Sequence, residues 1–274
     1  MNFFAALDRA VERNRSLVCV GLDPAMAKLP ECVRSCDKAF FEFNRRIVDA
    51  TRDFVCCYKP QSAFYAGEDR DDELAMTIDY IHENAPGIPV ILDVKRGDIG
   101  STAEQYAREA FERYNADAVT VNPYMGFDAV KPFLDYADKG VIVLCRTSNP
   151  NSGDLQNLTV GGGRPLYEHL ALLVRDKWNG SGNAALVVGA TYPEELKRLR
   201  ELCPNMAFLV PGVGAQGGDV EKVVRNGCNA AGRGIIVNSS RGIIFAGKGE
   251  DFALAAGRAA QDLRDAINRF REVL

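Results

Sequence analysis

Short apolar runs alternate with longer amphipathic stretches along most of the chain. Eight of these runs are rich in Val, Ile and Leu and contain few polar residues. They cover residues 17–22, 54–58, 90–94, 118–121, 141–145, 185–188, 207–210 and 234–237. Nearly continuous hydrophobicity in such short runs is typical of strands that are covered on both faces, as in parallel sheets.

Amphipathic stretches with helical spacing separate the apolar runs. After the third run, Ser101 and Glu104 have the spacing of a capping box, which predicts a helix that starts there. Similar helical patterns cover residues 36–52, 69–84, 127–137, 165–178, 193–202, 217–227 and 251–272. Eight strands that are each followed by a helix predict an α/β fold, a (β/α)8 TIM barrel, with an extra N-terminal helix over its bottom. An open, doubly wound sheet is the alternative.

Composition and length agree with one globular unit. The chain has 274 residues, of which 47% are hydrophobic and 26% are charged, and these fractions are ordinary for a globular protein. Barrels of this class commonly form one domain of about 250 residues. No linker, low-complexity tract or block of charge divides the sequence, so we expect residues 1–274 to form a single domain.

The charge balance and the cysteines narrow the cellular setting. With 33 Lys and Arg against 37 Asp and Glu, the net charge of −4 predicts no nucleic-acid partner and no binding to acidic membranes. No apolar stretch approaches the roughly 18 residues of a membrane span, and early charges argue against a secretory signal. The eight cysteines form no C-x-x-C pair, so we expect free thiols in a cytoplasmic protein. Only His82 and His169 are present, which makes catalytic triads and metal sites built on several histidines improbable.

Polar residues follow most of the predicted strands. In a barrel, the active site lies at the C-terminal ends of the strands. The residues at or just past those ends are Asp23, Lys59, Asp93, Lys95, Asn122, Arg146, Thr147, Ser148, Thr191, Gln216, Asn238 and Arg241. This arrangement predicts a polar site at one end of the barrel.

Alternating charges mark the exit of the third strand. Asp93 and Lys95 are two residues apart on an extended chain, so their side chains point to the same side. Asp98 is positioned either to curl back to this mouth or to reach a neighbouring subunit. Lys59 adds a second ammonium group, and charges of opposite sign that alternate make burial tolerable. The alternative is a structural ion pair that closes the barrel.

Two glycine-rich turns follow the last two strands. They read PGVGAQGGD at residues 211–219 and NSSRGI at residues 238–243. In barrels these two loops often bind phosphate through backbone N–H groups, and a helix that begins near Gly217 would present its positive end there. Arg241 is able to bind a phosphate through two N–H groups at once. Together the turns predict a site for a phosphate monoester.

One long connection, residues 147–165, is rich in Gly, Asn and Ser and has little periodicity. Connections longer than about 12 residues are often functional lids. A tolerated surface insertion is the alternative.

The whole set of motifs resembles a known family. LDVKRGDIGSTA at residues 92–103 is similar to the signature D-x-K-x-x-D-I-G-x-T of orotidine 5′-phosphate decarboxylases. GLDP at 21–24, YKPQ at 58–61, PGVGAQGGD and NSSRGI resemble further blocks of that family in the same order. CRTSNP at 145–150 and the long connection after it are similar to the longer bacterial-type branch. The resemblance covers residues 21–243.

The resemblance implies an activity, a homodimer and a set of roles. The activity is decarboxylation of orotidine 5′-phosphate to UMP in pyrimidine biosynthesis, without a cofactor or metal. The implied charge network consists of Lys59, Asp93, Lys95 and Asp98, with Lys95 as the proton donor to C6. Asp98 and Thr102 would cross the dimer interface. The implied substrate contacts are Asp23 and Thr102 for the ribose, Ser148 for the pyrimidine, and Gln216 and Arg241 for the phosphate. In some members of the family a tyrosine beside this glutamine helps to hold the phosphate. No tyrosine stands beside Gln216 here, which leaves a third phosphate contact unassigned.

Two other functions remain open on the residues. One is a Mg²⁺-dependent sugar-phosphate decarboxylase or aldolase on the same scaffold, which also uses D-x-K-x-x-D. The IGST and PGVGAQGG segments favour the nucleotide enzyme. The other is a non-catalytic sensor that binds a nucleotide. A sensor has no need of the charges of Lys59, Asp93, Lys95 and Asp98.

Overall fold

Eight parallel strands form one sheet in the computed structural model, which describes residues 2–213 and 219–273. The strands are β1 Val18–Leu22, β2 Cys57–Pro60, β3 Ile91–Arg96, β4 Ala118–Val121, β5 Gly140–Arg146, β8 Ala184–Val188, β9 Phe208–Pro211 and β10 Ile235–Ser239. Their order is β2-β1-β10-β9-β8-β5-β4-β3, and all of the pairings between these neighbours are parallel. Parallel bridges join the two outer strands, Tyr58 to Val90 and Gln61 to Asp93. These bridges close the sheet, so the predicted barrel is confirmed over the open sheet.

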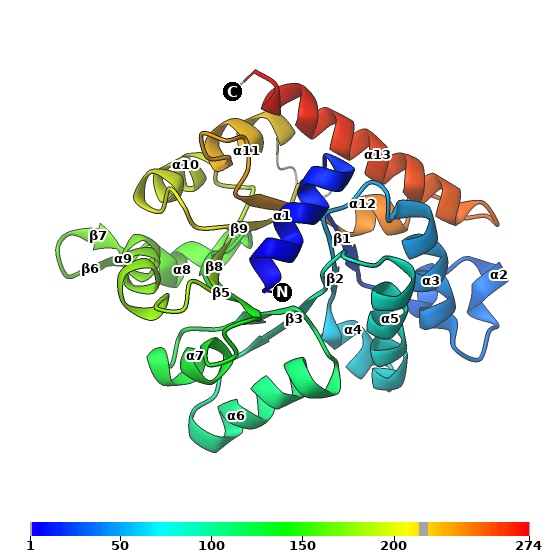
Figure 1. Ribbon diagram of the computed structural model, residues 1–274, viewed down its shortest axis with the longest axis horizontal. Coiled ribbons are helices and arrows are strands. Elements are labelled where there is room, and N and C mark those ends of the chain that lie inside the picture. The colour runs from blue at the N-terminus through cyan, green and yellow to red at the C-terminus, as the bar shows by residue number, and fades with distance from the viewer. Residues whose placement is uncertain (1, 214–218, 274) are drawn as a thin grey trace.

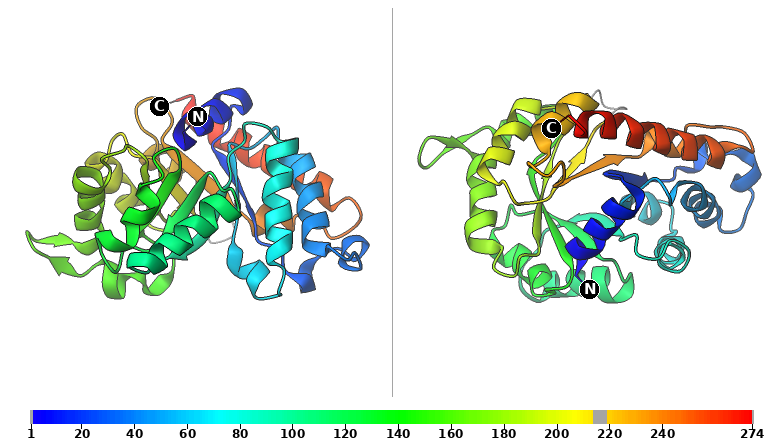
Figure 2. Two further views of the ribbon diagram at one scale, coloured as in Figure 1. Left: turned by 60° about the horizontal axis from the view of Figure 1, so that its bottom comes forward. Right: turned by 45° about the horizontal axis from the view of Figure 1, so that its top comes forward.

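Helices surround the barrel on its outside (Figures 1 and 2). The helices that follow the strands include α3 Ala39–Thr51, α5 Asp71–Asn84, α6 Gly100–Arg108, α7 Phe127–Leu134, α9 Leu166–Leu173, α10 Pro193–Leu202, α11 Val220–Gly227 and α13 Phe252–Arg271. Four shorter helices were not predicted from the sequence: α2 Glu31–Arg34, α4 Ser62–Ala66, α8 Gly153–Gln156 and α12 Arg241–Ile244. Helices α6 and α9 each continue into a π-helical turn, Glu109–Arg113 and Val174–Trp178.

Helix α1, Phe3–Asn14, crosses the end of the barrel where the strands begin (Figure 1). The backbone N–H of Phe3 donates to the carbonyl of Asp138 at 2.9 Å, and its ring packs on the first residue of β5, Gly140. A Cβ atom on Gly140 would lie 2.4 Å from that ring, so only glycine fits. The predicted helix over the barrel bottom is therefore confirmed, and the opposite end is left open for a site.

Three details of the sequence prediction are wrong. Strand β2 begins at Cys57 rather than residue 54, because its paired register with β1 starts at Cys57, and the residues before it are buried and apolar although they lie outside the strand. The capping box is wrong because α6 begins at Gly100, so Ser101 is inside the helix and no side chain caps it. The helix expected to begin near Gly217 is α11, which begins at Val220. The carboxylate of Asp219 accepts hydrogen bonds from the backbone N–H groups of Glu221 and Lys222 at its start. That helix end is therefore already occupied by an anion.

The long connection at residues 147–165 consists of two parts. The first contains a 3-10 turn, Pro150–Ser152, and α8, while the second is a hairpin of β6 Thr159–Val160 and β7 Arg164–Pro165. Figures 1 and 2 show the hairpin projecting outward beyond the ring of helices. Only the first part lies next to the strand ends, and the lid role stays a prediction.

Arg146, the last residue of β5, holds the first part of this connection. Its side chain is 2% exposed and lies over the ring of Tyr192, with 3.6 Å from the guanidinium carbon to the ring centre. It donates to the hydroxyl of Ser152 and to Oε1 of Gln156, the latter at 3.3 Å. Gln156 in turn accepts the backbone N–H of Thr147 at 3.0 Å. A buried guanidinium therefore fixes the backbone that leads into Ser148.

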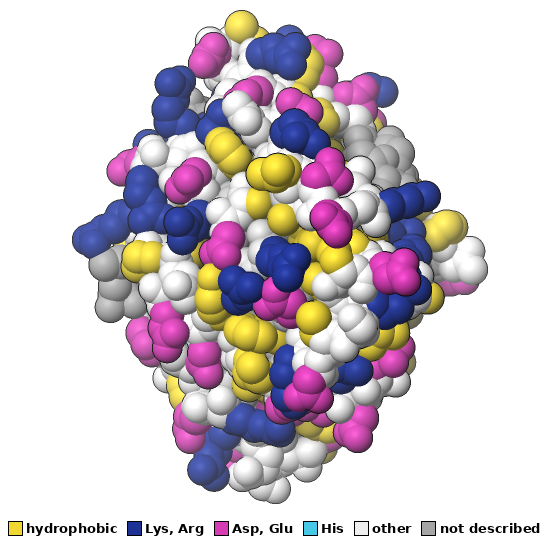
Figure 3. All heavy atoms as spheres, turned by 90° about the vertical axis from the view of Figure 1, so that its right-hand side faces the viewer, with side chains coloured by type: hydrophobic (Ala, Val, Ile, Leu, Met, Phe, Trp, Pro, Cys, Tyr) yellow, Lys and Arg dark blue, Asp and Glu magenta, His cyan; other side chains and the backbone are white. Residues whose placement is uncertain are grey.

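Surface charge and thiols complete the picture. On the face that carries α2 and α3, basic and acidic side chains are interspersed, without a field of one sign (Figure 3). All eight cysteines are free, and six of them are buried: Cys19, Cys56, Cys57, Cys145, Cys203 and Cys228. Among the described residues, no helix has the length and apolarity that a membrane crossing requires. The single-domain assignment stays a prediction.

Candidate active site

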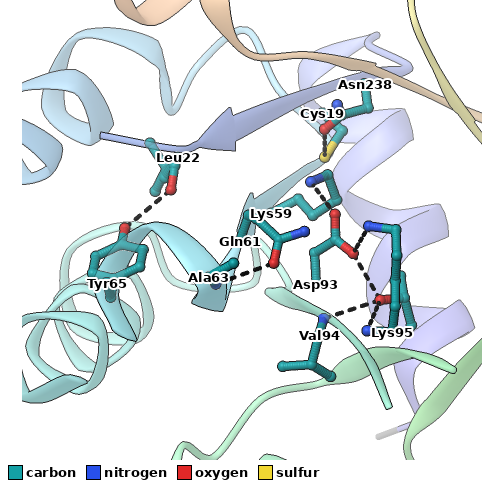
Figure 4. A network of polar contacts seen from close by, with 11 residues as sticks. Cys19, Leu22, Lys59, Gln61, Ala63, Tyr65, Asp93, Val94, Lys95 and Asn238 are labelled. Atoms are coloured by element: carbon teal, nitrogen blue, oxygen red, sulfur yellow. Dashed lines mark hydrogen bonds and ion pairs between the residues drawn. The ribbon is translucent and has the colours of Figure 1, made fainter. Parts of the chain in front are cut away.

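Lys59, Asp93 and Lys95 form a charge network where β2 and β3 end. Asp93 accepts from both lysines, from Lys59 Nζ at 2.7 Å through Oδ2 and from Lys95 Nζ at 2.6 Å through Oδ1. Figure 4 shows the carboxylate between the two ammonium groups. The side chains of Lys59 and Asp93 are 5% and 8% exposed, whereas that of Lys95 is 43% exposed. The structure thus brings three predicted residues together and leaves one ammonium group open to a ligand.

Thr120 of β4 organises this network from below. Its hydroxyl donates to Oδ1 of Asp93 at 2.8 Å and accepts the backbone N–H groups of Val94 and Lys95 at 3.1 and 3.0 Å. Lys95 has a φ of 50°, in the left-handed region that side chains other than glycine rarely adopt. Strained backbone of this kind persists only where neighbours enforce it, and it gathers at functional sites. The sequence signal for Thr120 was its polar side chain within the apolar run AVTV.

The charges of the network support one another. Burial alone raises the pKa of Asp93, but Lys59 and Lys95 outweigh burial and hold that pKa well below its ordinary value. Burial alone lowers the pKa of Lys59, but Asp93 and then Asp23 outweigh it and raise that pKa above its ordinary value. Asp93 is therefore an anion and Lys59 a cation at neutral pH.

Asp98 and Thr102 lie apart from the three clustered residues. The carboxylate of Asp98 accepts a hydrogen bond from the backbone N–H of Ile99 at 2.8 Å, and Thr102 is exposed in the first turn of α6. Among the described residues, neither makes a hydrogen bond or ion pair with the charge network. The structure of one chain thus leaves open the prediction that both serve a second subunit.

A pocket of about 510 Å³ continues the site along β1, β9 and β10. Its lining consists of Asp23, Lys28, Phe64, Pro211, Gly212, Val213, Asn238, Ser239, Ser240, Arg241 and Phe245. Two predicted ligand residues, Asp23 and Arg241, therefore share one cavity. Asp23, which lines the pocket, follows the strand whose Gly21 pairs with Lys59, and its negative charge acts on Lys59, so the pocket adjoins the charge network.

Close packing of two turns shapes this pocket. A Cβ atom on Gly21 would lie 2.7 Å from Cβ of Ser240, so glycine is required where the β10 turn crosses β1. Cys19 donates to Oδ1 of Asn238 at 3.4 Å (Figure 4). Oδ1 of Asp23 and the hydroxyl of Ser240 are buried and have no hydrogen-bond partner among the described residues. Buried polar atoms without partners are costly, and a hydroxyl-bearing ligand in the pocket would satisfy them.

Two further predicted binding residues are Ser148, which the structure places beyond β5, and Gln216, which it does not describe. Ser148 is half-buried beyond β5, where its carbonyl accepts from the hydroxyl of Thr191 at 3.2 Å. Gly189 lies behind it, because a Cβ atom there would be 2.8 Å from the Ser148 backbone. Gln216, predicted to bind phosphate, and Gly217 lie outside the described residues.

Two site residues have signals that were too weak to single them out. Lys28 lies five residues beyond Asp23 in an irregular segment, and Asn238 was noted only as a residue at a strand end. As for metals, residues 2–213 and 219–273 contain no group of three or more His, Cys, Asp or Glu side chains arranged to hold an ion.

Comparisons with known proteins show the family of this chain. A family model described as "Orotidine 5'-phosphate decarboxylase / HUMPS family" matches residues 16–255. A curated relative from Azoarcus sp. (strain BH72), "Orotidine 5'-phosphate decarboxylase", is 59% identical over 271 residues, which cover 99% of this chain and 100% of the relative. The family description covers both orotidine 5′-phosphate decarboxylases and HUMPS proteins, and this relative is named as an orotidine 5′-phosphate decarboxylase.

Solved structures show the same likeness. The structure of Leishmania donovani OMP decarboxylase is 40% identical with a TM-score of 0.85, and the match covers 99% of both chains. The UMP synthase of the same organism is 42% identical with a TM-score of 0.87. This second match covers 99% of the present chain but 57% of the synthase chain, so the similarity is confined to part of that larger protein.

Proposed function

Because the chain belongs to the orotidine 5′-phosphate decarboxylase / HUMPS family, we propose that it is a carboxy-lyase that converts orotidine 5′-phosphate to UMP and CO₂. The observation that carries this proposal is the network of Lys59, Asp93 and Lys95 beside the pocket that holds Asp23 and Arg241. In the cell this reaction would supply UMP as a step of pyrimidine biosynthesis. Free thiols fit a reducing compartment, which supports a cytoplasmic location.

In the proposed mechanism the bond between C6 and the carboxyl carbon breaks, and the electron pair stays on C6. The ammonium group of Lys95 would stabilise this developing charge and then donate its proton to C6, after which the amine recovers a proton from water. Asp93 and Thr120 hold Lys95 in place for this step, through its Nζ and its backbone N–H.

Asp93 would also act on the substrate carboxylate. Two like charges about 4 Å apart repel by roughly 4 kcal/mol at an effective dielectric of 20, and the loss of CO₂ relieves that repulsion. The lowered pKa of Asp93 keeps its charge in place for this effect.

The remaining contacts would bind the two ends of the nucleotide. We assign Arg241 and Gln216 to the phosphate, Asp23 and the partner's Thr102 to the ribose, and Ser148 to the pyrimidine. Phosphate contacts far from C6 supply binding energy that positions the reacting bond. The unpartnered Oδ1 of Asp23 in the pocket supports its role as an acceptor for a ribose hydroxyl.

Arg241→Ala tests the phosphate assignment. The variant should raise KM for orotidine 5′-phosphate by about 100-fold, because a guanidinium with two N–H groups on a phosphate contributes roughly 3 kcal/mol. Its free energy of unfolding should stay near the wild-type value, since the side chain is exposed and forms no ion pair among the described residues. Steady-state kinetics and urea unfolding provide the two measurements. A variant that lost stability but kept its KM would refute the phosphate role.

A direct assay separates this function from the rivals. Decarboxylation changes the ultraviolet absorbance of the pyrimidine, so turnover of orotidine 5′-phosphate is followed continuously. We expect turnover that EDTA does not inhibit. A Mg²⁺-dependent sugar-phosphate enzyme would lose activity with EDTA and would not act on the nucleotide, and a sensor would bind without turnover.

We further propose that two chains form a homodimer in which Asp98 and Thr102 of each chain complete the site of the other. Four large apolar side chains near this end are 40–78% exposed: Ile99, Tyr124, Met125 and Phe127. Their two loops are in contact, because Asn122 N–H donates to Arg96 O at 2.7 Å and Gly97 packs against Asn122. Apolar side chains exposed together in this way are typical of an interface between proteins.

Mixing two inactive variants tests the shared site. Lys95→Ala and Asp98→Ala should each have very low activity alone. After refolding together in equal amounts, half of the dimers would contain one intact site, so about a quarter of the wild-type activity should return. The control is a mixture of either variant with itself. If Asp98 served the site of its own chain, no activity would return on mixing.

A further inference from the structure

Lys28 lies in the proposed substrate pocket but belongs to none of the motifs. It closes the 3-10 turn Met26–Lys28 that follows β1, and its side chain is exposed. The pocket is lined by two cations, Lys28 and Arg241, and by one carboxylate, Asp23. Among the described residues, neither cation forms an ion pair with a carboxylate. The pocket is therefore positive, and its excess charge is not neutralised within these parts of the chain.

The backbone of Lys28 is fixed although its side chain is exposed. Its N–H donates to the carbonyl of Ala25 at 2.8 Å, and the next residue, Leu29, is 1% exposed. Arg34 donates to the carbonyl of Leu29 at 2.7 Å. A lysine on such an anchored turn loses little backbone entropy when it binds a ligand.

The ammonium group of Lys28 is directed toward helix α12. Its Nζ lies 5.5 Å from the centre of the Phe245 ring, a cation–π geometry. That ring is stacked on buried Phe43 with 5.7 Å between centres, so its position is set by the core. Phe245 directly follows α12 and lines the same pocket as Arg241. Lys28 therefore lies at the cavity that Arg241 also lines.

We infer that Lys28 is a further substrate-binding residue, which contacts the phosphate group of the nucleotide together with Arg241. A phosphate monoester carries nearly two negative charges at neutral pH, so a second cation matches its charge. The contact fills the place of the third phosphate ligand, which no motif supplies. This inference rests on the proposed function and adds Lys28 to the residues that distinguish a nucleotide from a nucleoside.

Lys28→Met, with matched substrates, tests the inference. Its kcat/KM for orotidine 5′-phosphate should fall by about five- to tenfold, mainly through KM, because an exposed ion pair is modest in strength. The difference from wild type should shrink at high salt, which screens exposed charges. With orotidine, which lacks the phosphate, the variant and the wild type should agree within about twofold. Lys28→Arg should recover most of the loss.

The control variant is Lys248→Met. Lys248 is also exposed and follows α12, but it does not line the pocket, so both substrates should behave as with wild type. Equal losses on nucleotide and nucleoside, or no loss on either, would overturn the inference while the proposed function stands. Absence of turnover by the wild-type enzyme would instead overturn the proposed function. In that event, binding of UMP and uridine to the same variants decides the role of Lys28.

Discussion

Lys95→Ala is expected to lower kcat for orotidine 5′-phosphate by about 10⁴-fold or more. One side chain would lose two functions, the stabilisation of negative charge at C6 and the donation of a proton to it. Each function alone is worth about 10²-fold or more. KM should change less than kcat, because the variant leaves the proposed phosphate and ribose contacts of the pocket untouched. Steady-state and single-turnover kinetics measure both quantities.

The fold should survive this change. The Lys95 side chain is 43% exposed, and its backbone N–H still donates to Thr120 in the variant. Lys95→Gly is the second variant, since glycine adopts the positive φ of this position without strain. Lys131→Ala is the control, because it removes a lysine of an exposed ion pair with Asp135 on α7. A folded Lys95→Ala enzyme with near-normal kcat would refute the proton-donor role.

The architecture of the protein was largely predictable from its sequence. Strands β1, β4 and β9 lie within one residue of the apolar runs because each is buried on both faces, and burial is what the hydrophobic pattern records. The error at β2 has the same origin. Residues 55 and 56 are as fully buried as the strand itself, so hydrophobicity could not distinguish the residues before the strand from the residues of the strand.

The charge network was predictable for a different reason. Asp93 and Lys95 follow an apolar run, and parallel strands bring their C-terminal ends together, so contact with Lys59 follows from topology. The left-handed backbone of Lys95 was not predictable, because it depends on the hydroxyl of Thr120 from the neighbouring strand. Local sequence around Lys95 carries no sign of it.

Residues that act through tertiary packing were missed for the same reason. Lys28 lies in an irregular turn, and only the fold places it over Phe245, more than 200 positions away in the chain. The capping box failed because Ser101 and Glu104 have the right spacing but the N-cap of the helix is Ile99, two residues before Ser101. The spacing of residues in the sequence shows where a helix is able to begin, but tertiary packing determines where it does begin.

Asp93→Asn is expected to lower the free energy of unfolding by about 3 kcal/mol at neutral pH, and to lower kcat as well. Within residues 2–213 and 219–273, Asp93 is the one carboxylate hydrogen-bonded to Lys59, whose side chain is 5% exposed and cannot reach water without rearrangement. An unpaired buried charge costs roughly 3–5 kcal/mol. The loss in kcat follows because Asp93 also positions Nζ of Lys95.

The pH dependence of this loss gives its cause. The pKa of Asp93 is lower in the folded protein, so its stabilising effect is complete above the unfolded value of about 4 and fades as the pH falls below it. The raised pKa of Lys59 adds stability that is complete below about pH 10 and is lost at higher pH. The difference in unfolding free energy between wild type and Asp93→Asn should therefore be flat around neutral pH, from about pH 5 to 7, and shrink in acid.

Asp135→Asn is the matched control for urea unfolding across this range. The Asp135 carboxylate pairs with Lys131 at 2.7 Å, a distance equal to that between Asp93 and Lys59, but both side chains are more than half exposed. Solvent and salt weaken such a pair, so its loss should cost less than about 1 kcal/mol. Equal losses in the two variants would mean that burial does not strengthen the Asp93 network. In that case the lowered pKa of Asp93 would need a cause other than its ion pairs with buried Lys59 and half-exposed Lys95.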